Sequence, residues 1–518
     1  MMLLLSILVI PLFTSILINI CSIGNRTIRI SFPNISKSLQ ISSKDIVKYL
    51  PIFSSFITLL IIIIYANQNN LVTKNTHQEL IRLYDLFPSL NVSMSFGVTK
   101  ISIALLVLSN ITIITALFST LNIEKRLNQI NTLISIISVG IFGLILADDL
   151  FVFFLFYEIA VVPMFLIITN WGYNLTREVS GPFSKILNTL SVGTKNYGAY
   201  KITLYLLIGS MLIFLGLGSI GIVEGTFSIS ELLMPERRIS YNIYAYFLLL
   251  IGFGAHSALW PFHTWVPDGH GTAPTAGSII FAGILMKIGI IGFIKILIPL
   301  MSDIFIEYSS LLIILASINI IYGALTAMMQ DDLKYLAAYA SLSHIGYIFL
   351  ALAMHNQIGI NGAIVQTISH GLIISLLFFS IGIIHATKGT RSIKELNSMM
   401  DNSPLLSYIF IFAAFASIGF PLTSGFIAEF LIMSSVWIYS HFLLVIPLLG
   451  ILITTLYMFR TVKKICLKFR DDNKNQIDLN INERIICYTL IVLILLIGIF
   501  PNFVITFLTG ESIKIIGI

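Results

Sequence analysis

Apolar residues form long unbroken runs along most of this chain, and short polar, charged or Gly/Pro-rich breaks separate them. A run of about 20 apolar residues is long enough for a helix that crosses the hydrocarbon core of a membrane. The runs do not alternate residue by residue, as the strands of a membrane barrel would. The pattern therefore predicts an all-α polytopic membrane protein with about fourteen transmembrane helices. The predicted spans cover residues 2–22, 50–66, 99–121, 131–147, 150–170, 200–223, 241–260, 276–299, 307–329, 333–354, 360–386, 404–438, 441–459 and 485–508.

The amino-acid composition agrees with this pattern. Of the 518 residues, 57% are hydrophobic and only 10% are charged, and the mean hydropathy is +0.95. A soluble domain carries about 25% charged residues, so a soluble enzyme, a disordered chain and a protein with a single anchor are excluded. The first residues, Met1 to Leu5, contain no basic segment, and we interpret them as the start of a span and not as a cleaved presequence.

Basic residues are distributed unevenly between the two sides of the predicted bundle. Of the 30 Lys and Arg residues, 22 fall in or beside odd-numbered loops and 5 in or beside even-numbered loops. Loops rich in Lys and Arg stay on the inner side of a membrane. We therefore expect the odd-numbered loops inside and both termini outside. This bias also accounts for the net charge of +6 without a nucleic-acid partner.

Two predicted spans are interrupted in a similar way, one between Gly254 and Pro261 and the other between Gly419 and Gly425. Proline removes a backbone donor and glycine loosens a helix, so both spans should be broken helices. Paired breaks are typical of inverted repeats around a polar site at the membrane midplane; two unrelated kinks are the alternative. The repeats predict four parts: N-terminal helices at 1–130, a first five-helix repeat at 131–299, a second at 300–465, and a charged loop with the last helix at 466–518.

Few ionisable side chains lie inside the predicted spans. A charge at the bilayer centre costs at least about 2.5 kcal/mol and is rarely kept without a pairing or transport role. Groups of this kind on successive helices could form a proton-conducting row with intervening water. Asp149 stands nine residues before the first of them and could supply it with protons. The candidates are Glu158, His256, Lys287, His344, His370 and Glu429.

Each candidate also has a simpler interpretation. The two acids could be structural groups paired with a neighbouring helix, and His344 and His370 could be hydrogen-bonded packing residues. Lys287 is too far from either end of its span for its side chain to reach the membrane surface. His256, His263 and His270 recur every seven residues, but the prolines between them and the lack of a Cys or carboxylate cluster argue against a metal site.

Other kinds of catalytic chemistry leave no trace in the sequence. There is no Gly-rich nucleotide loop, no haem or iron–sulfur spacing and no nucleophile elbow. Cys21, Cys466 and Cys487 lie far apart and form no CxxC-like motif. If this chain takes part in a redox reaction, the electrons must move elsewhere.

Two segments of the chain resemble known signatures. The stretches from Pro261 to Ser278 and from Asp332 to Gly346 are similar to those of the proton-pumping membrane subunits of NADH:quinone oxidoreductase, which share ancestry with Mrp-type cation/proton antiporters. Within this family, Tyr157-Glu158 before Val162-Pro163, the segment from Leu285 to Gly289, and the segment from Gly425 to Phe430 resemble chain 4. The resemblance covers most of residues 90–465.

The resemblance implies a core membrane-arm subunit of complex I in the mitochondrial inner membrane, with both termini on the intermembrane-space side. Such a subunit translocates protons while electrons pass from NADH through FMN and iron–sulfur clusters to ubiquinone in partner subunits; this chain itself would hold no cofactor. Implied partners are the antiporter-like chains 2 and 5 and membrane lipids, and no nucleic acid. The family's proton path maps onto Glu158, His256, Lys287, His344 and Glu429, with Asp149 and His370 as additional candidates.

The sequence departs from the family pattern at the first interrupted span. Relatives usually carry lysine at the position of His256 and proline where this chain has Ala258, and Gly269 and Thr272 are also replacements. A His256–Glu158 pair would then stand where a lysine–glutamate pair is usual. A stand-alone Mrp-type antiporter is the alternative function, and a purely structural subunit is a third.

Overall fold

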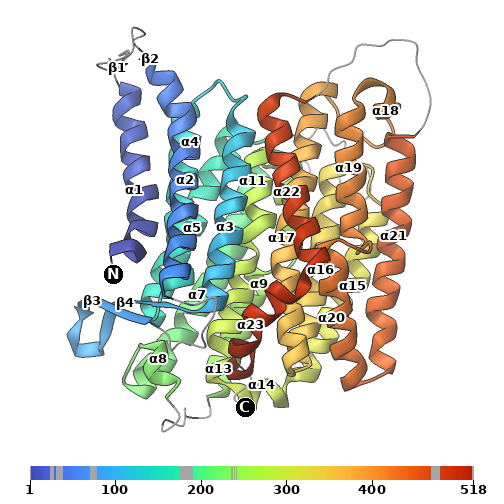
Figure 1. The fold of residues 1–518 in the computed structure, drawn as a ribbon. Helices are drawn as coiled ribbons and strands as arrows, with labels where there is room; N and C mark the ends of the chain where they lie inside the picture. Colours follow the sequence, from blue (N-terminus) through green and yellow to red (C-terminus); the bar gives the residue numbers. More distant parts are fainter. Residues whose placement is uncertain are drawn as a thin grey trace.

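The computed structural model describes residues 2–23, 28–30, 39–69, 79–174, 191–234, 237, 240, 242–467 and 479–515. Within them, twelve helices are long and apolar enough to cross a membrane, and they stand side by side in one bundle (Figure 1). The predicted all-α membrane fold is confirmed. The long helices of the first half are α1 (Met2–Ile23), α2 (Ser43–Gln68), α3 (Lys100–Thr120), α4 (Leu127–Leu146), α5 (Leu150–Trp171) and α7 (Lys195–Glu224).

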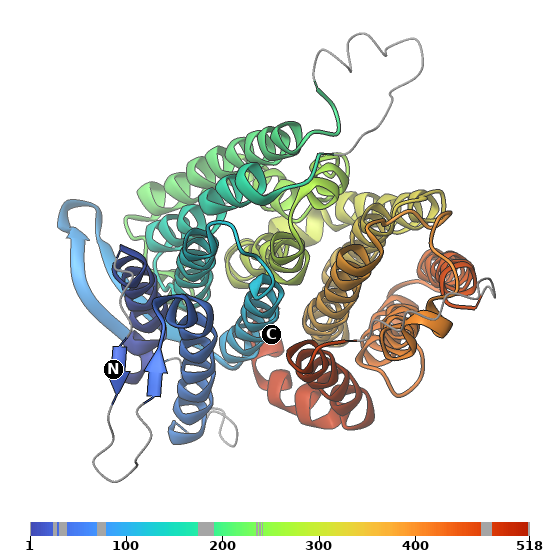
Figure 2. The same ribbon diagram turned by 90° about the horizontal axis from the view of Figure 1, so that it is seen from above.

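The second half of the bundle contains the most deeply buried spans. In the segment Thr275–Leu300, in α16 (Leu333–Ala353) and in α17 (Gln357–Lys388), 94% of the apolar window is buried, against 28% in α21 (Val445–Ile465) and α22 (Ile481–Ile499). Seen from above, α1 and α2 lie at one end of the array, and α19 (Pro404–Ser417) and α21 lie at the other (Figure 2). The long helices here are α15 (Ser309–Met328), α16 (Leu333–Ala353), α17 (Gln357–Lys388), α21 (Val445–Ile465) and α22 (Ile481–Ile499).

Both predicted helix breaks are present. α9 (Ile243–His256) stops at His256 and the chain resumes as α10 (Trp265–Thr272); α19 (Pro404–Ser417) is likewise separated from α20 (Ser424–Tyr439). The linkers contain left-handed backbone at Ala258 (φ 60°), Gly419 (φ 76°) and Leu422 (φ 74°), a conformation that a helix cannot include. The total of fourteen spans stays a prediction, because it depends on how these interrupted segments are counted.

The helix that carries Lys287 is irregular. It consists of α11 (Thr275–Ile280), the π-helical η2 (Phe281–Leu285), α12 (Lys287–Gly292), the π-helical η3 (Phe293–Leu297) and α13 (Ile298–Leu300). π turns are rare and occur mostly as single turns at functional sites. They displace backbone carbonyls from the regular i→i−4 ladder, so those carbonyls can accept from side chains.

The last span was predicted at 485–508, and its predicted C-terminal boundary is wrong. α22 stops at Ile499, and α23 (Pro501–Ile515) continues in another direction (Figure 1). Pro501 cannot donate to the preceding turn, and it disfavours helical backbone at Phe500. Phe500 accordingly has φ −118° and ψ 58°. The N-terminus and the C-terminus both lie toward the end of the bundle where β3 and β4 are found (Figure 1).

Short elements outside the spans were not predicted from the sequence. An antiparallel hairpin of β3 (Glu79–Phe87) and β4 (Val92–Val98) pairs Glu79 with Val98 and Phe87 with Val92. The charged loop expected at the start of the last part falls largely on residues 468–478, outside the described residues. The remaining elements are β1 (Ile28–Ile30), β2 (Leu39–Ile41), η1 (Pro88–Leu90), α8 (Ile229–Leu232), α14 (Ser302–Glu307), α18 (Met399–Asn402) and η4 (Phe442–Leu444).

Candidate functional site

Lys287 lies at the centre of the most buried part of the bundle. It is the first residue of α12, between the two π-helical segments, and its side chain is 0% exposed. The ammonium group donates to the carbonyl of Ala282 in η2 and lies 2.8 Å from Nδ1 of His370. A lysine ammonium has three donors and no acceptor, so these two acceptors satisfy most of its capacity without a carboxylate.

His370 and His344 continue the polar line from Lys287. The two rings, from α17 and α16, have centroids 5.5 Å apart at an interplanar angle of 43°. His344 is held on both sides, with Nε2 3.3 Å from the Ser417 hydroxyl and Nδ1 3.3 Å from the side-chain nitrogen of Gln366. In this arrangement the side-chain nitrogen of Gln366 donates to Nδ1 of His344.

Glu429 closes the line at the second helix break. Its Oε1 lies 3.9 Å from Nδ1 of His344, and its side chain is almost fully buried. A cavity of about 10 Å³ between α16, α17, α19 and α20 is lined by His344, Gln366, Ser417 and Glu429 among others, which is near the size needed for one water molecule. Gly419 has a left-handed φ of 76°, which strains any residue with a side chain, and a Cβ there would also displace the Glu429 carboxylate.

His256 ends α9 at the first break. Its Nδ1 is 2.8 Å from the hydroxyl of Tyr157, and its Nε2 is 2.8 Å from the carbonyl oxygen of Leu285. The expected His256–Glu158 pair is therefore not formed: the residue that contacts the imidazole is the neighbour of Glu158. Successive residues on a helix point about 100° apart, so Tyr157 and Glu158 cannot both face α9.

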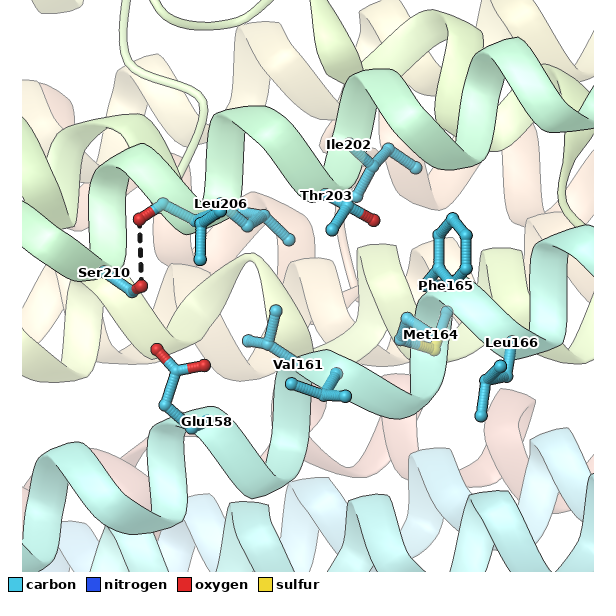
Figure 3. Close-up of a pocket in the computed structure, with 11 residues that line it drawn as sticks. Glu158, Val161, Met164, Phe165, Leu166, Ile202, Thr203, Leu206 and Ser210 are labelled. Carbon is cyan, nitrogen blue, oxygen red and sulfur yellow. Dashed lines mark hydrogen bonds between the residues drawn. The ribbon is translucent and has the colours of Figure 1, made fainter.

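Glu158 faces a different part of the bundle. Its carboxylate is partly exposed and lies at one end of a cavity of about 220 Å³ between α5 and α7 (Figure 3). In the described part of the chain, this carboxylate has neither a hydrogen bond nor an ion pair. Apart from Glu158, Thr203 and Ser210, the lining is apolar and includes Val161, Phe165 and Leu206.

Asp149 is a helix cap, and we expected it to supply Glu158. The carboxylate accepts from the backbone nitrogens of Phe151 (2.8 Å), Val152 (3.2 Å) and Ser93 (3.0 Å). Glu158 is nine residues further along α5, about 14 Å at the rise of an α-helix. Burial, opposed by the backbone hydrogen bonds, raises the pKa of Asp149 to about 6. These contacts give Asp149 a local role at the start of α5.

Replacing Asp149 with alanine should destabilise the chain by about 1 kcal/mol or more, the usual cost of losing an N-cap. Asp149→Asn keeps an acceptor and should lose less. Because the folded pKa lies above the unfolded value, ionisation of Asp149 lowers stability as pH rises from about 4 to about 6. Thermal inactivation of the solubilised protein across this range would show whether Asp149→Asn removes that dependence; identical profiles in the two proteins would contradict the assignment.

The remaining histidines of the seven-residue pattern lie in unrelated surroundings. His263 packs edge-on against Tyr322, and His270 stacks on Phe378 with centroids 4.8 Å apart. Neither shares a contact with the Tyr157–Leu285 pocket that holds His256. The three histidines therefore lie on α9, on the linker that follows it and on α10, and not on one aligned face.

Four of the predicted residues thus form one line through the interior, in the order Lys287, His370, His344, Glu429. This spatial order differs from the order along the chain, because α17 lies between α12 and α16 at this depth. His256 joins the line through the backbone of Leu285, whereas Glu158 and Asp149 stand apart from it. Tyr157, Gln366 and Ser417 were not among the predicted site residues, because neutral polar residues inside a span give no charge signal.

A multi-pass bundle with a continuous line of titratable side chains through its interior defines a class of membrane proteins built to move ions. The family described as NADH:quinone oxidoreductase/Mrp antiporter, TM, matches residues 147–454, more than half of the chain. The chain belongs to this family. The matched region contains every residue of the interior line.

Individual relatives agree with the family match. The chain is 32% identical over 438 residues to NADH-quinone oxidoreductase subunit M of Rickettsia prowazekii, covering 83% of this chain and 85% of the relative. It is 28% identical over 451 residues to NAD(P)H-quinone oxidoreductase chain 4 1 of Synechococcus elongatus, covering 85% and 81%. The resemblance to chain 4 is confirmed.

Solved structures share the fold. A chain of respiratory complex I from Thermus thermophilus superposes with a TM-score of 0.80 at 21% identity, covering 99% of this chain and 98% of that one. A chain of the Mrp complex from Dietzia sp. superposes with a TM-score of 0.79 at 17% identity, covering 98% and 96%. At these identities the likeness describes the fold and does not distinguish the two functions.

Proposed function

We propose that this chain is a proton-translocating membrane-arm subunit of an NADH:quinone oxidoreductase. The observation that carries the proposal is the buried line from Lys287 to Glu429, in which each side chain lies next to another that can bind a proton. Charged groups this deep are costly to retain without a transport role. The relatives named subunit M and chain 4 favour the respiratory complex over other uses of such a line.

Electron transfer belongs to partner subunits in this proposal. NADH, FMN, iron–sulfur clusters and ubiquinone would be bound there, and the neighbours in the membrane would be the antiporter-like chains 2 and 5. The partly exposed Glu158 supports a neighbour on the α5–α7 face, because a carboxylate at this depth needs a polar partner. We place the complex in the mitochondrial inner membrane, with the basic loops on the matrix side.

Proton transfer would begin with a change of charge near Glu158 and His256 that is driven from outside the chain. Lys287 and His370 lie 2.8 Å apart, and two positive charges this close repel each other strongly at low dielectric. A proton that arrives on Lys287 would therefore favour release of a proton from His370 toward His344. From there it would pass to Glu429 and leave on the outer face. An equilibrium between two charge states, biased by a distant site, is an ordinary means of coupling.

Co-purification is the first test of this assignment. A tagged copy of the chain should bring flavin- and iron–sulfur-containing subunits out of mild detergent, and the complex should reduce quinone with NADH. In the same complex, Glu158→Gln should lower proton pumping while assembly is retained, with Glu395→Gln at the surface as the control. Recovery of a complex without flavin and iron–sulfur clusters would overturn the assignment.

A stand-alone Mrp-type antiporter is the second candidate, because the matched family is described as NADH:quinone oxidoreductase/Mrp antiporter. The two functions differ in their driving reaction. Vesicles that hold the chain and its membrane partners would exchange sodium or potassium for protons without NADH if the antiporter assignment were correct. Under the respiratory assignment, proton movement depends on NADH and quinone.

A further inference from the structure

The hydrogen bonds of His256 determine where its protons lie. The Leu285 carbonyl oxygen can only accept, so Nε2 of His256 carries a hydrogen. In the neutral ring, Nδ1 must then accept, and the Tyr157 hydroxyl donates to it. In the charged ring, Nδ1 donates and the same hydroxyl oxygen accepts. A tyrosine hydroxyl can do both, so the direction of this one hydrogen bond can reverse without displacement of either ring.

We propose that Tyr157 and His256 form the proton-responsive pair at the first helix break, with Tyr157 as the residue that positions the imidazole and sets its proton affinity. This inference rests on the proposed function and refines it. Both side chains are buried, and their rings lie 4.9 Å apart between centroids. The pair stands in the place where an ion pair with Glu158 was expected.

The surroundings of His256 offer few other groups that titrate. α5 contributes Tyr157 and, facing α7, Glu158; α12 contributes Lys287, and η3 contributes Lys295, which donates to the carbonyl of Ile145. The neutral contacts come from three elements. Gly209 of α7 lies beside Ala255. Trp265 of α10 donates to the Ala255 carbonyl, and Asn319 of α15 donates to the Ala258 carbonyl.

The pair is also joined to Lys287 through the backbone. Leu285, whose carbonyl accepts from His256, is the last residue of η2, and Lys287 begins α12 two residues later. A hydrogen bond from a charged donor is roughly twice as strong as one from a neutral donor. Gain of a proton by His256 therefore tightens its hold on the end of the π-helical segment beside Lys287. This gives the first break a physical connection to the interior line.

Tyr157→Phe in the assembled complex tests the proposal, because it removes one oxygen atom and keeps the ring. The matched control is Tyr246→Phe on α9, whose hydroxyl is buried and has no hydrogen-bond partner in the described part of the chain. The phenol supports the charged imidazole more strongly than the neutral one. We therefore expect Tyr157→Phe to move the alkaline limb of pumping against pH toward acid by about one unit, a tenfold change in proton affinity. Tyr246→Phe should leave the profile in place.

Two further measurements keep the test independent of assembly and of the proposed function. Fluorotyrosine at position 157 retains the shape and the hydroxyl but is a weaker acceptor, so it should shift the same limb in the same direction. In a His256→Leu background, Tyr157→Phe should add no further loss. An unshifted profile in either Tyr157 variant, or an additive loss in the double variant, would overturn the inference. The proposed function would still stand in that case if Lys287→Ala abolished pumping. Normal pumping by Lys287→Ala would instead remove the proposed function and this inference with it.

Discussion

Lys287→Ala is expected to lower proton pumping by about a hundredfold, the lower end of what a positioned proton-transferring side chain contributes. The ammonium is the link between the π-helical segment and His370, and no other side chain in the described structure donates to Nδ1 of that imidazole. Its removal leaves His370 without a proton donor on this side. Pumping in proteoliposomes, measured per NADH oxidised, is the readout.

Two companion variants separate this effect from damage to the fold. Lys287→Met fills the same space without a charge and should be as defective as alanine. Lys295→Ala removes the other lysine of the same irregular helix, which donates to the carbonyl of Ile145 and touches none of the line; it should pump nearly normally. Equal activity of the Lys287 and Lys295 variants would show that the charge at position 287 is dispensable.

Glu429→Gln should produce a loss of similar size, with a different cause. Glutamine matches the shape of the carboxyl group but cannot exchange a proton, so transfer should stop between His344 and the outer face. Because the side chain is buried against Gly419, the isosteric amide should leave assembly unchanged. NADH-driven pumping and blue-native gel analysis would be measured together.

A result in which Glu429→Gln pumps as well as the unaltered chain would show that protons leave from His344 by another route. Glu429→Asp is the informative companion, because it keeps the acid but withdraws it from Nδ1 of His344, now 3.9 Å away. Partial activity in that variant, with none in glutamine, would identify proton exchange as the property that matters. Glu395→Gln, at an exposed acid, is the control for loss of a carboxylate alone.

The membrane fold could be predicted because its signal is simple. Apolar runs and charge bias depend only on hydrophobicity and length, and the predicted breaks near Pro261 and Gly425 follow from the chemistry of proline and glycine. The π-helical segments around Lys287 have no comparable signal, since they depend on packing: η2 lies against α3 and α17, and η3 lies against α9. The β3–β4 hairpin was missed because a search for apolar runs does not detect strands at the membrane surface.

The candidate site was predictable as a set of residues and not as an arrangement. Charge inside a span identified Lys287, His344, His370 and Glu429, but order along the chain placed His344 before His370, and the structure reverses this. The predicted contact between Glu158 and His256 does not form, and the reason is geometric. A helix directs neighbouring residues to different sides, so the position of α9 selects Tyr157 and turns Glu158 toward α7.

The outward-facing carboxylate of Glu158 has a consequence for biogenesis. A copy of the chain that has just entered the bilayer presents this group to lipid at one end of the groove between α5 and α7, at a cost of about 2.5–3.5 kcal/mol if it stays charged. Docking of a polar neighbour removes that penalty. Under the proposed function, this carboxylate would therefore make the unassembled chain less stable in the bilayer than the chain in its complex, and the difference would favour early assembly.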